Sequence, residues 1–165
     1  MNINTWYPAT GFFFQVEVAG FEKDSDLLFK EVTGLNVEVG SEDLVEGGEN
    51  TFTWSLPKQP KSGTFSLKRG MYAGSSNFTQ WVLDTIHTNY TEPITLREIK
   101  IKLLDMTGIS YDNYSVDYIK PIVIWTISNA RPTKYNVSDL DSMKNEVLWE
   151  SIEFTYTNYR KEICQ

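Results

Sequence analysis

Apolar and polar residues alternate along much of this chain, with the period of two that a β-strand shows when one of its faces is buried. The alternation is clearest at residues 12–18, 51–56, 64–68, 97–103 and 147–156. Residues 122–127 are instead apolar on both faces, and we expect such a strand to be buried on both sides, within the subunit or by a neighbour. The pattern predicts a mostly β protein.

The stretch from Glu46 to Gly70 predicts an extended β-hairpin. Its two strands would be Thr51–Leu56 and Thr64–Lys68, because prolines and a glycine in residues 57–63 interrupt strand pairing between them. The apolar residues of the two strands are Phe52, Trp54, Leu56, Phe65 and Leu67. An isolated hairpin is marginal in water, so these side chains must pack against the body of the protein or against a neighbouring chain.

One helix is expected at residues 77–88, where Asn77 followed by Gln80 resembles a capping box. An apolar stripe then falls on one helical face, which we expect to cap an open end of the β structure. The stripe consists of Phe78, Trp81, Val82, Thr85 and Ile86. Elsewhere, Gly34 should bend the extended run of residues 28–39. Residues 160–165 should form a loose tail.

With 165 residues the chain is long enough for one real core, and we expect a single domain over residues 1–165. Its net charge of −7 argues against sequence-independent binding of nucleic acid, which depends on Lys and Arg side chains that neutralise phosphates. The charge does not exclude a passage through which a polyanion slides without sticking.

Cys164 is the one cysteine, which excludes an internal disulfide and fits a reducing compartment. The first residues lack the basic and apolar regions of a secretion signal, and no apolar run is long enough to span a membrane. We therefore expect synthesis and folding in a cytoplasm, without direct membrane anchoring.

No residue pattern points to catalysis, to a metal site or to a cofactor. His87, the single histidine, falls at the end of the expected helix without a serine or cysteine partner, so we expect a surface residue. The carboxylates of residues 42–49 lack the spacing of a calcium loop. Asp139 and Asp141 lack a third ligand nearby.

Several short motifs, taken in their order along the chain, resemble the tube proteins of contractile phage tails and phage-tail-like injection systems. The early ones are Glu46-Gly47-Gly48-x-Asn50, Leu56-Pro57 and Gly63-x-x-x-Leu67-Lys68-Arg69-Gly70. The later ones are Phe78 with Trp81, Trp125-x-x-x-Asn129-Ala130-x-Pro132 and Asn145-Glu146-Val147-x-x-Glu150-Ser151. The resemblance runs from about residue 12 to about residue 156.

The resemblance implies an antiparallel β-barrel or closed sandwich of about six to eight strands, with one short helix and an extended hairpin. It implies a structural subunit without enzymatic activity or cofactor. Six such subunits would form a ring, and the rings would stack into a hollow tube inside a contractile sheath. Baseplate, spike and tube-terminator proteins would be further partners. Cargo or DNA would pass through the lumen without specific binding.

The hairpin and the doubly apolar strand both offer more apolar surface than a monomer of this size needs, and such a surplus indicates an interface between subunits. Gly47 and Gly48 would let the backbone pass close to a neighbour, where a β-carbon would obstruct it. The expected interface residues are Gly47, Gly48, Asn50, Phe52, Trp54, Leu56, Pro57, Lys68, Arg69, Ile122, Ile124 and Trp125.

Two other classes of function stay open at the level of the sequence. A small-ligand or carbohydrate-binding β-domain would use Trp6, Trp54 and Tyr111 as stacking platforms, and a barrel enzyme would depend on His87. Neither alternative predicts ordered rings. The sequence does not distinguish a phage tail from an extracellular injection particle or from a cell-anchored secretion system.

Overall fold

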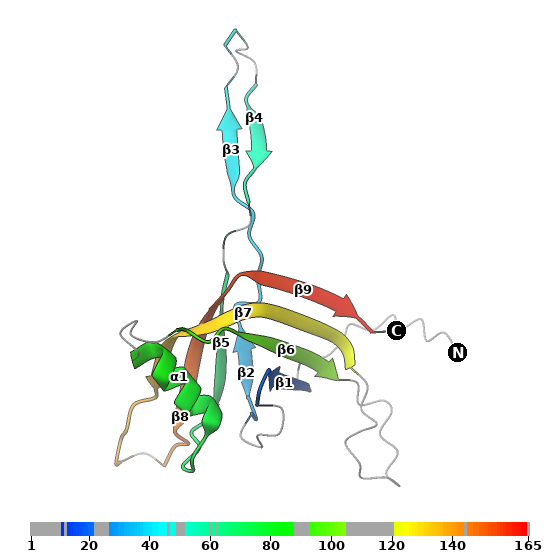
Figure 1. The fold of residues 1–165 in the computed structure, drawn as a ribbon. Helices are drawn as coiled ribbons and strands as arrows, with labels where there is room; N and C mark the ends of the chain where they lie inside the picture. Colours follow the sequence, from blue (N-terminus) through cyan, green and yellow to red (C-terminus); the bar gives the residue numbers. More distant parts are fainter. Residues whose placement is uncertain are drawn as a thin grey trace, which may run out of the picture.

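The computed structural model of the protein describes residues 11, 13–21, 27–45, 47–48, 52–59, 61, 63–87, 93–104, 121–143 and 145–164. Nine strands and one helix lie within these ranges (Figure 1). They are β1 (Phe14–Val18), β2 (Glu31–Thr33), β3 (Ser41–Leu44), β4 (Trp54–Pro57), β5 (Gly63–Gly70), α1 (Asn77–His87), β6 (Arg97–Leu104), β7 (Pro121–Val137), β8 (Trp149–Tyr156) and β9 (Asn158–Ile163). The expectation of a mostly β protein with one helix is confirmed.

Seven of these strands form the body, an antiparallel sheet with the strand order β1-β6-β7-β8-β5-β2 and with β9 paired to β7. Strand β7 joins the two halves of the sheet, because residues 121–130 supply its pairs with β6 and β9 and residues 131–137 its pairs with β8. Over the described residues the hydrogen-bonded order does not close on itself. The antiparallel sheet of the expected fold is confirmed, and its closure into a barrel or sandwich is not detected among the described strands.

The core of the body is formed by the faces that the alternating pattern predicts. Its strand residues with the lowest exposure include Val16, Val18, Ile99, Ile101, Ile152, Phe154 and Tyr156. Helix α1 lies to one side of the sheet and buries Phe78, Trp81 and Val82 against it (Figure 1). The Trp81 and Phe154 rings stack with centroids 6.2 Å apart. The helix therefore covers the sheet with the predicted stripe.

The N-cap of α1 is Ser76, one residue before the expected position. The Thr79 backbone N–H donates to Ser76 Oγ at 3.0 Å, which is the contact that an N-cap side chain makes with the third helical residue. Gln80 does not reach back to the cap, because its amide donates to Asp84 Oδ1 at 2.6 Å on the exposed side of the helix. The expected capping box is therefore replaced by a simple serine cap.

Strands β3 and β4 pair with each other in a separate two-stranded sheet that projects from the body (Figure 1). We call residues 41–57 the arm. The predicted pairing of residues 51–56 with residues 64–68 is wrong, because β5 pairs with β2 and β8 inside the body. The turn of this hairpin includes Gly47 and Gly48, while Pro57 lies at its base opposite Ser41.

Gly34 bends the chain directly after β2, as expected. It has a φ of +82°, and a β-carbon there would lie 2.9 Å from the Thr64 carbonyl oxygen. Both observations favour glycine at this position. The bend separates β2, which belongs to the body, from the segment that leads into the arm.

Strand β9 corrects the expectation of a loose tail. Residues 158–163 pair with β7, with Lys161 opposite Trp125, and the Cys164 N–H donates to the Ile122 carbonyl at 2.8 Å. Most of β9 is exposed and charged, so it lacks the apolar alternation by which the other strands are predicted. Charged side chains are typical of edge strands, because they discourage pairing with other chains.

Arg69 and Glu150 form an ion pair inside the body, with side chains that are 1% and 2% exposed. Arg69 Nε donates to Glu150 Oε1, and Arg69 Nη2 donates to Thr79 Oγ1 at 2.6 Å. The Tyr135 hydroxyl donates to Glu150 Oε2 at 2.7 Å. Burial, together with this hydrogen bond, raises the pKa of Tyr135 to about 12, so the phenol keeps its proton. The pair thus links α1 to β5, β7 and β8.

Either Arg69→Met or Glu150→Met alone should lower the free energy of unfolding by about 3–5 kcal/mol, because each leaves an uncompensated buried charge. The double variant should be much closer to the unsubstituted protein. Denaturant unfolding of the monomer measures both. The matched control replaces both members of the exposed Lys58–Glu42 pair by methionine. This double substitution should lower the free energy of unfolding by at most about 1 kcal/mol. Additive losses in the Arg69 and Glu150 double variant would contradict the coupling.

Candidate subunit interface

The arm carries an apolar face that the subunit leaves half exposed. Antiparallel register places Leu44 opposite Trp54 and Glu42 opposite Leu56, and directly opposed residues share one face of a sheet. The Phe52 and Trp54 rings meet edge to face with centroids 5.2 Å apart. Phe52 is 52% exposed, Trp54 50% and Leu56 47%. A single two-stranded layer has no second layer to cover this face.

The other face of the arm is polar. Asp43 lies opposite Ser55, and Ser41 lies opposite Pro57. Glu42, which shares the face of Leu56, binds the Lys58 ammonium at 3.5 Å at the base of the arm, and both side chains are more than half exposed. The arm is therefore amphipathic, and only one of its faces gains by leaving water.

Gly47 and Gly48 form part of the turn at the tip of the arm and are exposed. Gly48 has a φ of +103°, which side chains rarely tolerate, whereas a β-carbon at either glycine would meet no atom of the subunit within 4 Å. Gly48 is thus required by the turn itself. Asn50 lies outside the described residues.

The strand that was expected to be buried on both faces is only partly covered. Ile122, Ile124 and Trp125 are each half-buried in β7. Trp125 packs against the core, with Ile101 of β6 and Lys161 of β9 on either side. Ile124 alternates with it and lies between Lys102 and Glu162 on the opposite face of the sheet. That outer face retains apolar surface beside charged neighbours.

The two basic residues of the Leu-Lys-Arg-Gly motif differ in their surroundings. Lys68 is half-buried, 4.0 Å from Glu31, and its ammonium lies 5.9 Å from the centre of the Trp149 ring. Arg69 is 1% exposed and bound to Glu150 within the subunit. Arg69 therefore supports the body and offers no surface to a neighbour.

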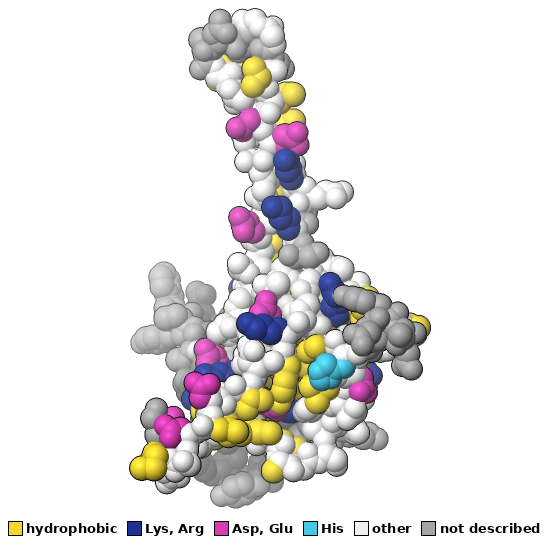
Figure 2. Space-filling view, turned by 90° about the vertical axis from the view of Figure 1, so that its left-hand side faces the viewer, with side chains coloured by type: hydrophobic (Ala, Val, Ile, Leu, Met, Phe, Trp, Pro, Cys, Tyr) yellow, Lys and Arg dark blue, Asp and Glu magenta, His cyan; other side chains and the backbone are white. Residues whose placement is uncertain are grey.

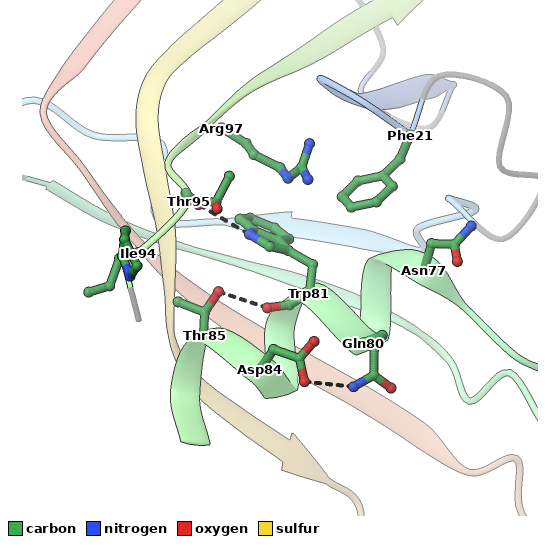
Figure 3. Close-up of a pocket in the computed structure, with 10 residues that line it drawn as sticks. Phe21, Asn77, Gln80, Trp81, Asp84, Thr85, Ile94, Thr95 and Arg97 are labelled. Carbon is green, nitrogen blue, oxygen red and sulfur yellow. Dashed lines mark hydrogen bonds between the residues drawn. The ribbon is translucent and has the colours of Figure 1, made fainter. Parts of the chain in front are cut away.

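A cavity of about 340 Å³ lies between α1 and residues 93–97 (Figure 3). Two polar side chains of its lining bind backbone carbonyls of the subunit: Trp81 Nε1 donates to the Thr95 carbonyl at 3.1 Å, and Arg97 Nη1 donates to the Ala19 carbonyl at 2.6 Å. The Arg97 guanidinium also lies 4.2 Å from the centre of the Phe21 ring. These contacts attach the helix to the sheet.

The aromatic platform of a ligand-binding domain is not assembled around this cavity by described residues. Trp54 lies on the arm, away from the residues that line the cavity. Trp6 and Tyr111 lie outside the described residues. Within the described part of the chain no three His, Cys, Asp or Glu side chains gather in a way that could hold a metal ion.

His87 is exposed at the end of α1, as expected, and Cys164 is a free, partly buried thiol beside β7. Among the described residues, no helix combines the length and apolarity needed to cross a membrane.

Two apolar residues of the arm escaped the sequence analysis. Leu44 is 47% exposed and Val45 73%. They lie in a segment that reads as an acidic loop, because Glu42, Asp43 and Glu46 surround them. The strand that holds Leu44 is only four residues long, Ser41–Leu44, and Leu44 is its one apolar residue, so the sequence shows no alternating pattern there.

The family model described as T4-like virus tail tube protein gp19 matches residues 10–160 of this chain. A sequence search of curated proteins finds no match.

Solved structures of high similarity come from contractile injection systems. One is from the sheath–tube complex of an extracellular contractile injection system, PVC, in the extended state, with a TM-score of 0.76, 21% identity and coverage of 97% of this chain and 95% of that one. A second is from the baseplate of the anti-feeding prophage, with a TM-score of 0.73, 25% identity and coverage of 94% and 96%. A third is from the tube-terminating cap of the anti-feeding prophage, with a TM-score of 0.76, 20% identity and coverage of 99% and 97%.

If the apolar face of the arm is an interface, Trp54→Ala should weaken self-association by about 2 kcal/mol or more, because aromatic residues at the centre of a contact carry much of its energy. Replacing Gly47 and Gly48 together by valine should also weaken self-association, because the substitution deforms the turn at the tip of the arm. Both variants should stay soluble and should remain β-rich by circular dichroism, because the arm is separate from the core of the body.

Thr53→Ala is the matched control, because residue 53 precedes Trp54 and alternates to the polar face. Sedimentation velocity at several concentrations separates these outcomes. If Trp54→Ala self-associates as strongly as the unsubstituted protein, the apolar face of the arm is not part of the interface. Outright unfolding of that variant would place Trp54 in the core instead.

Proposed function

The chain belongs to the T4-like virus tail tube protein gp19 family, and we propose on this basis that six copies form a ring and that rings stack into a hollow tube. It is a structural tail tube subunit of the kind found in phage tails and contractile injection systems, and not an enzyme. In this proposal residues 1–165 act as one tube-protein domain.

The observation that supports assembly most directly is the arm. It stands clear of the body (Figure 1), and Phe52, Trp54 and Leu56 on it are about half exposed in the single chain. A second copy is a suitable partner for this surface, because most soluble oligomers are built from identical chains. Contacts between different surfaces of identical copies give a closed ring when the rotation closes and a filament when it does not.

The half-covered strand β7 supports contacts around the ring. Ile122 and Ile124 keep exposed apolar surface, and β1, β2 and β9 each have a strand edge without a partner among the described strands. Unpaired backbone groups on such edges can be satisfied by a strand of a neighbouring copy. Sheets of adjacent subunits would then continue into one wall.

The partners proposed for this tube follow from the settings in which similar chains occur. Those chains come from a sheath–tube complex, a baseplate and a tube-terminating cap. We assign the same kinds of partner to this chain, together with a spike protein at the tip. The subunit would be made and assembled in a bacterial cytoplasm and become part of a phage-tail-like particle or cell-anchored machine.

The work of such a tube is passive. It is a rigid conduit that moves outward when the sheath shortens, and cargo or DNA passes along its lumen. A net charge of −7 per subunit disfavours tight binding of a polyanion, because association with phosphates requires clustered positive charge. The tube therefore conducts a nucleic acid or an acidic cargo without retaining it.

Mass measurement at micromolar concentration should show hexamers or stacks of hexamers, and negative-stain electron microscopy should show rings. Both measurements are made on the purified chain alone and with its sheath and baseplate partners. Monomer at every concentration, with those partners present, contradicts the proposal.

His87→Ala and Cys164→Ser should leave both assembly and injection intact, because the function requires no general base or nucleophile. Injection is read from delivery of a cargo by the complete particle. Particles that assemble normally but no longer inject would reveal chemistry at one of these two residues.

A further inference from the structure

Strand β7 turns a corner together with its partners β8 and β9, at the point where the two halves of the sheet meet (Figure 1). Antiparallel register places Asn129 of β7 opposite Thr157, the single residue between β8 and β9. On one side of this point β7 is joined to β6, and on the other side β8 is joined to β5. We call Asn129 and Thr157 the corner pair.

Asn129 has a left-handed backbone at this corner. Its φ is +55°, and it is the one non-glycine residue with a positive φ in the described part of the chain. Most side chains resist this conformation, whereas asparagine adopts it more readily. One register shift of β7, against β6, lies between Ile127 and Ala130, and a second, against β8, lies between Pro132 and Lys134. Such irregularities bend a strand and let it pass from one sheet to another.

The side chains of the corner pair bond to each other across the two strands. Asn129 Nδ2 donates to Thr157 Oγ1 at 2.9 Å. The Thr157 N–H donates to the Ser128 carbonyl at 3.3 Å, and the Thr157 hydroxyl donates to the same carbonyl at 3.4 Å. These bonds tie the left-handed residue of one strand to the residue at which the other strand changes its partner.

Burial does not hold the corner pair in place, because both residues are exposed. Ala130 beside them is fully buried, but apolar contacts are not directional and fix an angle less closely than hydrogen bonds do. Figure 2 shows hydrophobic side chains at the surface around His87, so the apolar interior is not fully enclosed on that side of the body. The corner pair therefore supplies a directional constraint on the angle between the two halves of the sheet.

This angle bears on assembly because the free strand edges lie in different halves. Among the described strands, β1 and β9 each have an unpaired edge in the half that contains β6, and β2 has one in the half that contains β5. If copies join at these edges, the rotation from one copy to the next follows from the angle between the edges that are used. A ring closes with a fixed number of copies only when every copy imposes the same rotation.

We infer that the corner pair sets the angle between the two halves of the sheet and thereby the number of copies in the ring. Asn129 and Thr157 are positioning residues, which act through the strands that they orient. The number of copies rests on the proposed tube, whereas the angle is a property of the single chain.

Thr157→Val and Asn129→Val test this inference. Thr157→Val should weaken the association of copies about fivefold, the equivalent of one lost hydrogen bond. Asn129→Val should weaken it about tenfold or more, because a β-branched residue resists the left-handed backbone. Both variants should give rings of mixed size or open arcs. Sedimentation measures the association, and electron microscopy counts the copies in each ring.

Thr157→Ser keeps the hydroxyl and should form rings of the unsubstituted size. Thr133→Val is the matched control, because the Thr133 hydroxyl also donates to a carbonyl of the neighbouring strand, that of Glu153 at 3.1 Å, but lies outside the corner pair. It should likewise form rings of the unsubstituted size. Rings of one unchanged size in Thr157→Val, or mixed sizes in Thr133→Val, overturn the inference, and Thr157→Val decides if Asn129→Val does not fold.

The angle itself is measured in the single chain. Spin labels attached at Lys161→Cys in β9 and Thr33→Cys in β2, with Cys164→Ser, place one label at an exposed position in each half of the sheet. Pulsed electron paramagnetic resonance below the assembly concentration should give one narrow distance distribution, which Thr157→Val broadens or shifts and Thr157→Ser does not.

An unchanged distance distribution in Thr157→Val overturns the inference, whether or not rings form. Absence of rings from the unsubstituted chain with its partners present contradicts the proposed tube instead, and the distance measurement still decides whether the corner pair sets the angle.

Discussion

A two-stranded ribbon cannot bury its own apolar face, and this constraint divides the molecule into two parts. The body has a second layer, because helix α1 and the folded sheet enclose Phe78, Phe154 and their neighbours. The arm has one layer only, so Trp54 and Leu56 stay half exposed in the single chain. Removing such area from water contributes roughly 25 cal/mol per Å² of apolar surface, before the cost of ordering the partners. The body is therefore stabilised by contacts within one chain, whereas the apolar face of the arm has no covering layer within that chain.

The body must hold the arm at a defined angle if many copies are to repeat regularly. The buried pair of Arg69 and Glu150 contributes to this rigidity, because it fastens the start of α1 to three neighbouring strands through Thr79 and Tyr135. Ion pairs of this kind add little net stability compared with apolar residues of equal volume. They do penalise alternative packings, in which one buried charge would lose its partner. We infer that the Arg69–Glu150 pair favours one packing arrangement of the body, and a regular tube requires that every copy has the same arrangement.

Assembly of identical copies into a tube requires contacts between different surfaces of the chain, because two copies joined through one shared surface satisfy each other and growth stops. The single chain leaves apolar residues exposed on the arm, among them Trp54 and Leu56, and beyond Gly70, among them Met71 and Tyr72. Similar chains occur in a baseplate and in a tube-terminating cap.

The sequence by itself determined the β class, the buried faces of β1, β6 and β8, and the position of the helix, because each depends on local periodicity. It also indicated that Phe52, Trp54 and Leu56 must pack against the body or against another chain. Tertiary structure decided which strands pair. Trp54 lies opposite Leu44 in the arm, and β5 pairs with β8 in the body. The alternation of apolar and polar residues shows that a segment is a strand, but it does not show which strand it pairs with. Tertiary structure likewise placed Arg69 inside and made a strand of residues 158–163, since burial of a charge and pairing of a charged edge both depend on neighbours distant in the sequence.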